Sequence, residues 1–515
     1  MLLDDALAHH ARFRPHAPAL IFRGHPTSYR VLEQRVNRCA NALIGLGVAK
    51  GDRVAILTQN HPVFAETLAA CARIGAVLVP LNYRLSMAEI SVILQASAPQ
   101  CVFVQDAFLG PLRDHDRALT PAGRTFVFDA SNDEGAGSYE ALLAAAKDTR
   151  PEVRRTPQDH VLLQYTSGTT GTPKGILSTH AGWIRASLIE PPLKGIGADS
   201  VFLNVMPMCH TGGAKWVVEV MFAGAAMTVG ENANVDEMLD QIARHRVTNT
   251  SIVPTTLYHL LDAPRRRTKD ISSLRYINYG GAPMSEQRLA QALEELGCNF
   301  TQGYGMTELA GGSVTYAGPA DHWANGAVSP KLRSAGRPLI DCEVRLLSED
   351  GALAGAGDTG EIAVRTDRLF TGYFGANAPA PPFDADGFFR TGDIGRFDDD
   401  GYLYVVDRAK DMIVSGGLNI YSKEVEDALL AHPAVSEAYV VGAPDEEWGE
   451  SVKAIIVQRQ NANMSAEDAI AWCREQLASY KKPRIVEFVR SEELPRTSLG
   501  KVVKRDLRAS DWRKR

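Results

Sequence analysis

The stretch RVAILTQNHPVFAETLAACARIGAVLVP, residues 53–80, decides the fold class. Its two ends, 53–57 and 76–80, are short apolar runs of the kind that form buried strands. Between them, residues 62–74 carry apolar side chains at helical spacing. A strand, a helix and a second strand in this order predict a βαβ unit, and such units build largely parallel sheets.

The same alternation extends in both directions and defines an α/β chain. Further helices are predicted at 32–46, 87–94, 235–245 and 285–296, and further strands at 101–104, 161–165, 225–229, 249–253, 276–279 and 300–303. From about residue 341 short strands and glycine-rich turns predict a β-rich subdomain, with strands at 360–365 and 401–406. After residue 410 the pattern predicts a compact α+β domain, with helices at 422–430 and 465–477 and strands at 436–441 and 452–457. We therefore expect a large domain at 1–407, whose β-rich part begins at about 341, and a small domain at 411–515.

Composition limits the classes of protein that this chain can be. Its 515 residues are 45% hydrophobic, which excludes disordered and fibrous proteins, and its net charge of −6 makes nucleic acid an improbable partner. The seven cysteines form no C-x-x-C pair, which argues against disulfides and metal clusters and favours a reducing compartment. Asp4 and Asp5 are wrong for a signal peptide, and no apolar run is long enough to span a membrane. The sequence thus predicts a soluble cytoplasmic protein.

The C-terminal end has the opposite charge from the rest of the chain. Residues 481–515 hold 12 basic and 5 acidic side chains, a local balance of +7. Such a segment can be a solvated helical end, or it can attract polyphosphate ligands such as ATP and coenzyme A. Contact with an anionic membrane surface is a further alternative.

The sharpest local motif is Thr166-Ser167-Gly168-Thr169-Thr170-Gly171-Thr172-Pro173-Lys174-Gly175, directly after the predicted strand 161–165. Its hydroxyls, open backbone N–H groups and one ammonium are what phosphate oxygens require, although a flexible surface turn can have the same composition. It is not a Walker A loop, because that motif places Ser or Thr directly after the lysine. No G-x-S-x-G or H-E-x-x-H motif occurs, so serine hydrolase and zinc protease readings have no support.

Further motifs follow in a fixed order. They are Gly280-Gly281-Ala282-Pro283, Gln302-Gly303-Tyr304-Gly305-Met306-Thr307-Glu308, Gly336-Arg337-Pro338, Thr391-Gly392-Asp393, Asp407-Arg408-Ala409-Lys410-Asp411, Ser415-Gly416-Gly417-Leu418-Asn419-Ile420 and Pro495-Arg496-Thr497-Ser498-Leu499-Gly500-Lys501. With the loop at 166–175, they make the chain resemble the adenylate-forming superfamily of acyl-CoA synthetases, peptide-synthetase adenylation domains and luciferases. The resemblance is closest to fatty-acyl and aryl acid CoA ligases.

The resemblance implies a role for each motif. The phosphates of ATP would be held by Thr166, Ser167, Gly168, Thr169, Thr170, Gly171 and Lys174, and Mg²⁺ by Glu308 with Thr166. The adenine would be bound by Gly281, Ala282, Pro283, Gln302, Gly303 and Tyr304, with Thr307 beside them, and the ribose by Asp393 and Arg408. The acid would be bound by His210, Thr211, Gly213, Trp216, Gly305 and Met306, and coenzyme A by Ser415, Gly416, Gly417 and Trp448. The implied catalytic group is Lys501, Glu308, Thr166 and Lys174, and Lys410 would be the pivot of a hinge at 408–410.

These roles imply a two-step ligase. The acid attacks the α-phosphorus of ATP and releases pyrophosphate; a thiol then displaces AMP, after the mobile small domain has turned. The expected substrate is a medium- or long-chain fatty, alicyclic or aryl acid. The alternatives are an enzyme that loads a carrier protein, a luciferase-like oxygenase, and a non-catalytic protein that binds nucleotide or acyl-AMP. An amino-acid substrate would want an acidic partner for its ammonium early in the stretch that forms the acyl pocket, where no clear candidate stands out and Glu219 is the one residue to consider. Two departures from the family pattern concern loop shape: Asp407 replaces a glycine, and 376–382 has an unusual composition.

Overall fold

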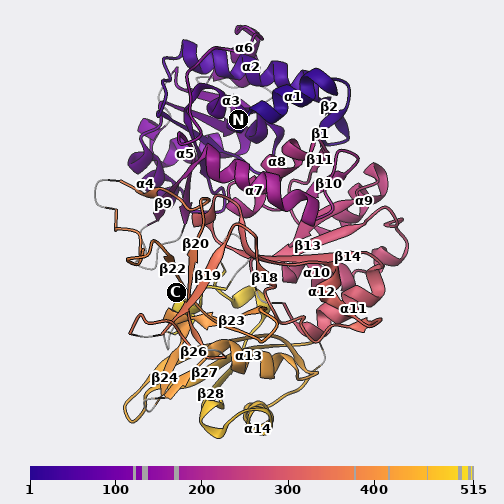
Figure 1. Ribbon diagram of the computed structural model, residues 1–515, viewed down its shortest axis with the longest axis vertical. Coiled ribbons are helices and arrows are strands. Elements are labelled where there is room, and N and C mark those ends of the chain that lie inside the picture. Colours follow the sequence, from indigo (N-terminus) through magenta and orange to yellow (C-terminus); the bar gives the residue numbers. More distant parts are fainter. Residues whose placement is uncertain are drawn as a thin grey trace. The chain divides into compact units, whose positions relative to one another are not determined.

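The computed structural model describes residues 1–119, 123–129, 137–166, 173–282, 284–348, 350–355, 357–375, 378–415, 418–460, 462–496, 502–508 and 512. The chain forms two compact units. Unit 1 consists of Met1–Gly281, Glu295–Trp323 and Thr366–Pro382, and unit 2 of Ala282–Glu294, Ala324–Arg365 and Phe383–Arg515. The predicted α/β class is confirmed, with parallel sheets in the N-terminal part and smaller β-rich and α+β parts after it (Figure 1). The boundaries 1–407, 408–410 and 411–515 stay a prediction.

The first sheet of unit 1 grows from the βαβ stretch at 53–80. Its strands lie in the order β21 (Gly372–Phe374), β9 (Lys174–Thr179), β8 (His160–Thr166), β4 (Val77–Leu81), β3 (Arg53–Leu57), β5 (Cys101–Gln105), β6 (Thr125–Phe128) and β7 (Gly137–Ser138). The strands from β8 to β7 pair in parallel, and β9 and β21 are added antiparallel. Helix α3 (Pro62–Ile74) connects β3 to β4 and ends at Gly75, whose φ of 74° suits glycine.

Both faces of this sheet are buried, as expected of a parallel sheet. Alternate residues of β3 belong to two cores: Val54 and Ile56 to one, and Ala55 and Leu57 to the other. The first core contains apolar residues of α2 (Tyr29–Gly45), α3 and α6 (Tyr139–Ala144), and the second those of α4 (Met87–Ser97) and α5 (Asp106–His115). Strict alternation therefore fixes which side chains of each strand point to which layer.

A second sheet completes unit 1. Its strands are β15 (Ser313–Ala317), β14 (Asn299–Gly305), β13 (Tyr276–Gly280), β12 (Asn249–Ile252), β10 (Val201–Asn204), β11 (Ala226–Val229), β1 (Pro18–Phe22) and β2 (His25–Ser28). The connecting helices of unit 1 include α7 (His180–Leu193), α8 (Thr211–Ala223), α9 (Val235–His245) and α10 (Pro254–Asp262), whereas most of α11 (Glu286–Leu296), between β13 and β14 in the chain, belongs to unit 2. One continuous core contains Phe202 and Met227 of this sheet together with Ile56 of the first, so the two sheets of unit 1 share it.

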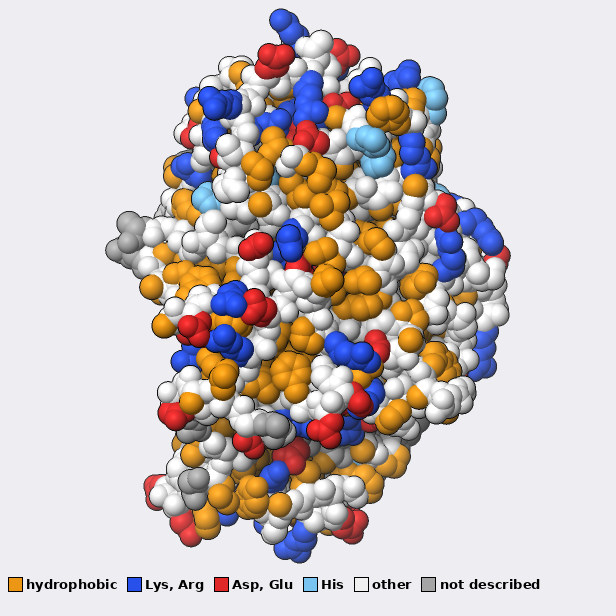
Figure 2. All heavy atoms as spheres, viewed as in Figure 1, with side chains coloured by type: hydrophobic (Ala, Val, Ile, Leu, Met, Phe, Trp, Pro, Cys, Tyr) orange, Lys and Arg blue, Asp and Glu red, His pale blue; other side chains and the backbone are white. Residues whose placement is uncertain are grey.

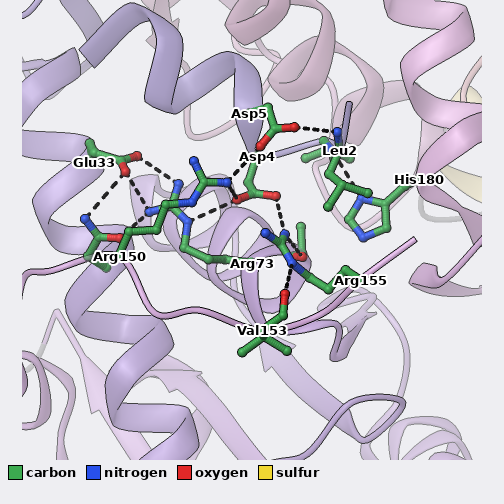
Figure 3. A network of polar contacts seen from close by, with 12 residues as sticks. Leu2, Asp4, Asp5, Glu33, Arg73, Arg150, Val153, Arg155 and His180 are labelled. Carbon is green, nitrogen blue, oxygen red and sulfur yellow. Dashed lines mark hydrogen bonds and ion pairs between the residues drawn. The ribbon is translucent and has the colours of Figure 1, made fainter. Parts of the chain in front are cut away.

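The start of the chain is tied into unit 1 by a buried charge network (Figure 3). The fully buried Asp4 carboxylate accepts hydrogen bonds from Arg73 at 3.1 Å, Arg150 at 2.8 Å and Arg155 at 2.6 Å. Burial alone would raise the pKa of Asp4, but these three guanidiniums outweigh it and lower the pKa. Asp4 precedes α1 (Asp5–Phe13), so the network fixes where the first helix begins.

Unit 2 contains two further sheets. One has the order β19 (Glu343–Leu347), β20 (Gly360–Arg365), β22 (Phe389–Phe397) and β23 (Leu403–Arg408), all antiparallel, which confirms the β-rich texture predicted from residue 341. The other has the order β25 (Leu418–Ile420), β24 (Ile413–Ser415), β27 (Gly449–Gln458) and β26 (Val435–Asp445), with β28 (Ile485–Phe488) parallel to β27. Its helices are α13 (Ser422–Leu430), α14 (Ala466–Gln476) and the short α15 (Lys504–Leu507). Ser465 and Asp468 form a capping box that opens α14.

The surface agrees with the modest net charge. On the face shown in Figure 2, acidic and basic side chains are interspersed and no large field of one sign appears. Within the described ranges, no helix is both long and apolar enough to cross a bilayer. All seven cysteines are free thiols, of which six are buried and Cys298 is partly exposed.

Candidate active site

The two ends of the predicted phosphate loop meet at one point of the first sheet. Thr166 ends β8 and Lys174 begins β9, and the antiparallel register pairs these two residues directly. The predicted ligands between them, Ser167, Gly168, Thr169, Thr170 and Gly171, lie outside the described residues. Thr166 and Lys174 are therefore cross-strand neighbours on one face of the sheet, which suits a shared phosphate ligand.

Tyr373 links the loop to the predicted Mg²⁺ residue. It lies on β21, opposite Ile176 of β9, and the Lys174 ammonium is 5.3 Å from its ring centroid. Burial and the nearby Glu308 carboxylate raise the pKa of Tyr373. The Phe370 N–H also donates to the Glu308 carbonyl at 2.7 Å, which fixes the short helix η3 (Thr307–Leu309) beside β21. Lys174 and Glu308, 134 residues apart by number, thus converge on one tyrosine that sequence reasoning missed.

These residues fit a magnesium ion that arrives with a triphosphate. Mg²⁺ is usually held by one or two carboxylates plus substrate phosphates, and not by a full protein cage. Among the described residues, no group of three or more His, Cys, Asp or Glu side chains could hold a metal ion. A carboxylate and a hydroxyl, such as those of Glu308 and Thr166, are the protein donors expected when substrate phosphates supply the other ligands of Mg²⁺.

Strands β13 and β14 carry several glycines at the predicted adenine pocket. Gly280 pairs with Gly303, and a Cβ on Gly280 would lie 2.8 Å from the Gly303 carbonyl oxygen. A Cβ on Gly303 would lie 2.5 Å from Ser313 Oγ. Gly281 follows with a φ of 76°, which suits glycine. These close contacts explain why Gly280 and Gly303 are glycines, whereas Gly281 has open space where a Cβ would lie.

The neighbouring predicted residues are held by the same strands. Gln302 accepts a hydrogen bond from the Tyr279 hydroxyl at 3.3 Å. A Cβ on Gly305 would lie 2.5 Å from the Gly312 carbonyl oxygen, so the chain folds tightly back after Met306. Ala282 is the first residue of unit 2, and Pro283 lies outside the described residues.

Four of the predicted acid-binding residues, His210, Thr211, Gly213 and Trp216, lie at the start of α8. Asn60 holds the preceding loop: it donates to the Met206 carbonyl at 3.0 Å and accepts from the Met208 N–H at 2.8 Å. Burial, assisted by Arg84, lowers the pKa of His210 to about 4, so its imidazole is neutral at physiological pH. A Cβ on Gly213 would lie 2.2 Å from the Pro207 carbonyl oxygen, which explains that glycine. Asn60 and Arg84 belong to no motif that the sequence analysis singled out, whereas Met208 lies in the segment 206–213 that resembles the family.

Thr211 has a specific partner on the first sheet. Its hydroxyl donates to Gln164 Oε1 at 2.9 Å, and Gln164 lies on β8 two residues before Thr166. Trp216, one turn further along α8, is buried and stacks on Phe202 with ring centroids 4.6 Å apart. Its ring is flanked by the ammonium groups of Lys194 at 4.6 Å and Lys215 at 5.1 Å.

Those two lysines belong to a buried charge cluster, which consists of Glu190, Lys194, Lys215, Glu219 and Arg368. Lys194 contacts Glu190 at 2.6 Å and Glu219 at 3.0 Å, and Lys215 contacts the same two carboxylates at 3.2 and 3.5 Å. Glu219, the one acidic residue considered for an amino-acid substrate, is therefore already neutralised by two cations.

The cluster also fixes the segment after Glu308. Glu190 accepts from the Ser313 N–H at 2.6 Å, and Arg368 donates to the Ser313 carbonyl at 2.6 Å. Burial would raise the pKa of Glu190, but Lys194, Lys215 and Arg368 hold it well below its usual range. The segment that follows Glu308 is thus held in place at Ser313 by hydrogen bonds to the charged side chains of Glu190 and Arg368.

In unit 2, the two predicted ribose ligands lie together. Asp393 of β22 pairs with Arg408 at the end of β23, and their side chains form an ion pair of 3.2 Å. Lys410 follows in the short helix η4 (Ala409–Asp411), and its carbonyl accepts a hydrogen bond from Arg508 at 2.6 Å. Burial and the neighbouring Arg408 lower the pKa of Lys410.

The unusual Asp407 has a structural explanation. Its carboxylate accepts from the Ser422 hydroxyl at 2.8 Å, at the first residue of α13. Lys504 also donates to Ser422, at 2.6 Å. Asp407 therefore links the strand before the predicted hinge to the helix after it.

Residues assigned to coenzyme A and to catalysis lie further along unit 2. Ser415 pairs with Gly449, the residue after Trp448, and the Arg484 guanidinium lies 4.4 Å from the Trp448 ring centroid. Gly416, Gly417 and Lys501 lie outside the described residues. A bridge between Arg496 and Val502 pairs the described residues on either side of Lys501. That Tyr304 and Glu308 of unit 1 share one pocket with Asp393 and Lys501 of unit 2 stays a prediction.

Comparison with known proteins gives matches along nearly the whole chain. The family model "AMP-binding enzyme" matches residues 7–374, and the model "AMP-binding enzyme C-terminal domain" matches residues 424–501. A fatty acid–[acyl-carrier-protein] ligase of Streptomyces coeruleorubidus is 36% identical over 99% of this chain and 96% of its own length. A feruloyl-CoA synthase of an Amycolatopsis species is 37% identical over 97% and 96%. Among solved structures, an anthranilate CoA ligase in complex with anthranoyl-AMP superposes with a TM-score of 0.89 at 26% identity, covering 99% of this chain and 96% of the other.

Proposed function

The chain belongs to the AMP-binding enzyme family, and we propose that it activates a carboxylic acid with ATP and transfers the acyl group to coenzyme A. The observation that carries this proposal is that the two family matches together include the phosphate loop, Glu308 and Lys501. A protein that only bound nucleotide would not need the metal carboxylate and the C-terminal ammonium. Their retention favours an enzyme over a non-catalytic homologue.

The first step makes the acid a better acyl donor. A carboxylate oxygen attacks the α-phosphorus of ATP, a new P–O bond forms, and the bond to pyrophosphate breaks. Thr166 and Lys174 would hold the phosphates, and Lys501 would offset the charge that grows at the α-phosphate. Glu308 and Thr166 would hold Mg²⁺, which supplies charge neutralisation at the phosphates when bound.

The second step transfers the acyl group to a thiol. The sulfur attacks the acyl carbon, and the bond to AMP breaks. Ser415 and Trp448 would line the path of the thiol, and the cation on Trp448, Arg484, suits an acceptor that carries phosphates. We infer that the part of the chain after Lys410 turns between the two steps, because Lys501 and Ser415 would serve them in turn.

The substrate is proposed to be a fatty, alicyclic or aryl acid. The two relatives described above are named for a fatty acid and for the feruloyl group, which is aromatic. Gly311 and Gly312, between Glu308 and the fixed Ser313, lie against Trp183 and Arg368, where a Cβ would come within 2.5 and 1.8 Å, so they do not widen the pocket. An amino acid is disfavoured, because Lys194 and Lys215 already neutralise Glu219.

A carrier protein is the second candidate acceptor. It is favoured by the relative named as a fatty acid–[acyl-carrier-protein] ligase, which aligns over 99% of this chain. Coenzyme A and the phosphopantetheine arm of a carrier protein present the same thiol, so only the rest of the acceptor distinguishes them. A reducing, cytoplasmic location suits the seven free cysteines.

The proposal is tested by measuring pyrophosphate release over a panel of fatty, alicyclic, aryl and amino acids. Each acid is assayed alone, with coenzyme A and with a phosphopantetheinylated carrier protein. We expect ATP-dependent release with at least one acid and formation of its thioester with coenzyme A. Thioester on the carrier protein alone would select the second acceptor. No acid-dependent release from the pure protein would contradict the proposed function, and oxygen uptake after acyl-AMP formation would indicate the oxygenase alternative.

A further inference from the structure

One buried side chain at the candidate acid site, that of Gln164, has a hydrogen-bond donor unused within the described part of the chain. Gln164 is only 3% exposed, and its Oε1 accepts the hydrogen bond from the Thr211 hydroxyl. Its amide nitrogen, Nε2, meets no hydrogen-bond partner among the residues that the structure describes. An amide NH₂ is a pure donor, so the missing partner is an acceptor.

The position of this amide on the sheet relates it to the substrates. Along β8, Leu162 lies in the core that contains α8, and Leu163 lies in the opposite core. Because side chains alternate, Gln164 and Thr166 lie on the same face as Leu162. Two residues along a strand span about 6.6 Å, so the amide lies one side-chain step from the proposed phosphate ligand. Its partner Thr211 begins α8 and is itself a proposed acid-binding residue.

We propose that Gln164 is a specificity residue of the acyl pocket, whose amide selects acids that carry a hydrogen-bond-accepting oxygen on the carbon skeleton beyond the carboxyl group. This inference rests on the proposed function and narrows its substrate class. Hydroxy-, methoxy-, oxo- and ether-substituted acids would complete the hydrogen bonding of Nε2. A purely hydrocarbon acid of the same shape would leave the donor unpaired.

The position of Gln164 favours an oxygen elsewhere on the substrate, and not the reacting carboxyl group, as the acceptor for Nε2. Thr211 fixes the orientation of the amide from the α8 side, where the proposed acid-binding residues gather. The phosphate ligand Thr166 lies on the other side, along the strand. An unpaired buried donor usually changes a binding constant by about 10- to 100-fold, which is the discrimination that one such group can supply.

The experiment compares acids that differ only in one acceptor. The first series pairs 2-, 3- and 4-methoxycinnamate with the corresponding ethylcinnamates, in which CH₂ replaces the oxygen. The second series moves a single ether oxygen along decanoate. For each acid, kcat/KM is measured by pyrophosphate release, and the Kd of the acid alone is measured by calorimetry. At one position or more, we expect the oxygen compound to be preferred at least 10-fold.

Two variants identify the group responsible. Gln164→Met keeps the size of the side chain and removes the donor; Gln164→Glu keeps the acceptor for Thr211 and also removes the donor. In both variants, kcat/KM for the oxygen-bearing acid should fall at least 10-fold, whereas kcat/KM for its hydrocarbon partner should change less than about 3-fold. Gln241→Met is the matched control, because Gln241 accepts the same kind of bond from Thr228 at 2.9 Å while its nitrogen is bound to Glu237. The preference should survive in that control.

Two results would overturn the inference. The first is a wild-type protein with no oxygen preference at any position of either series, which decides the matter even if both Gln164 variants fail to fold. The second is an equal fall of kcat/KM for both acids of a pair in the Gln164 variants. That result would mean that Gln164 binds the carboxyl group that both acids share, or that it only stabilises the fold. If the wild-type protein releases no pyrophosphate, the proposed function fails, and the calorimetric preference alone then tests Gln164.

Discussion

Glu190→Gln should destabilise unit 1 strongly, although it changes a single atom. In the folded protein, the Glu190 carboxylate lies 2.6 Å from the Lys194 ammonium, 3.2 Å from that of Lys215 and 2.9 Å from the Arg368 guanidinium. It also accepts from the Ser313 N–H and hydroxyl at 2.6 and 3.0 Å. Removing its charge leaves three buried cations with only one carboxylate, that of Glu219.

The magnitude follows from the burial of the cluster. Breaking a buried ion pair by neutralising one partner usually costs about 3–5 kcal/mol, because the remaining charge stays desolvated. At about 1.5 °C per kcal/mol for a unit of this size, the melting temperature should fall by roughly 4–7 °C. Urea and thermal unfolding followed by tryptophan fluorescence measure both quantities.

A surface carboxylate supplies the control. Glu231 forms an exposed ion pair of 2.6 Å with Arg23, and such pairs are worth about 0–1 kcal/mol. Glu231→Gln should therefore change the unfolding free energy by less than about 1 kcal/mol. If Glu190→Gln costs no more than this control, the cluster does not hold the segment around Ser313 as we describe.

Three further predictions concern the N-terminus, acid pH and the two steps of catalysis. Asp4→Asn should cost about 3–5 kcal/mol in urea unfolding, because three arginines share that buried carboxylate, whereas Asp5→Asn, on a half-exposed residue, should cost less than about 1 kcal/mol. The free energy of unfolding, measured by urea titration, should fall as the pH drops from about 6.5 towards 4. Burial lowers the pKa of His61, His180 and His210 from 6.5 to about 4 in the folded protein, so the unfolded chain binds more protons in this pH range. A free energy of unfolding that does not change with pH would contradict this prediction. Lys501→Ala should slow acyl-AMP formation by about 100-fold or more in single-turnover assays, and Lys410→Pro should slow thioester formation more than adenylation; equal loss in both steps would refute the hinge.

Elements with a strong local pattern could be predicted from the sequence. Strand β3 and helices α3 and α9 have the predicted bounds, because alternation, helical spacing and the adjacent proline or glycine are all local signals. The motif order likewise led to the family that the comparisons show. Such information is written in neighbouring residues, so it survives without knowledge of the tertiary structure.

The contacts that complete the site could not be read in this way. Tyr373 reaches Lys174 only because β21 adds to β9 from 200 residues away, and the three residues of that strand have no pattern of their own. The orphan amide of Gln164 lies in an otherwise apolar run and depends on which helix covers β8. In the sequence, Asp4 only argued against a signal peptide, whereas in the folded protein its buried carboxylate accepts hydrogen bonds from three arginines.

The way the two units are threaded has a practical consequence. Because each unit is assembled from three separate stretches, the backbone passes from one to the other after Gly281, Glu294, Trp323, Arg365 and Pro382. A single proteolytic nick at any one of these crossings leaves the others covalently intact, so it cannot release either unit. Truncating the gene cannot isolate either unit, since a fragment cut anywhere would carry an incomplete piece of one or both.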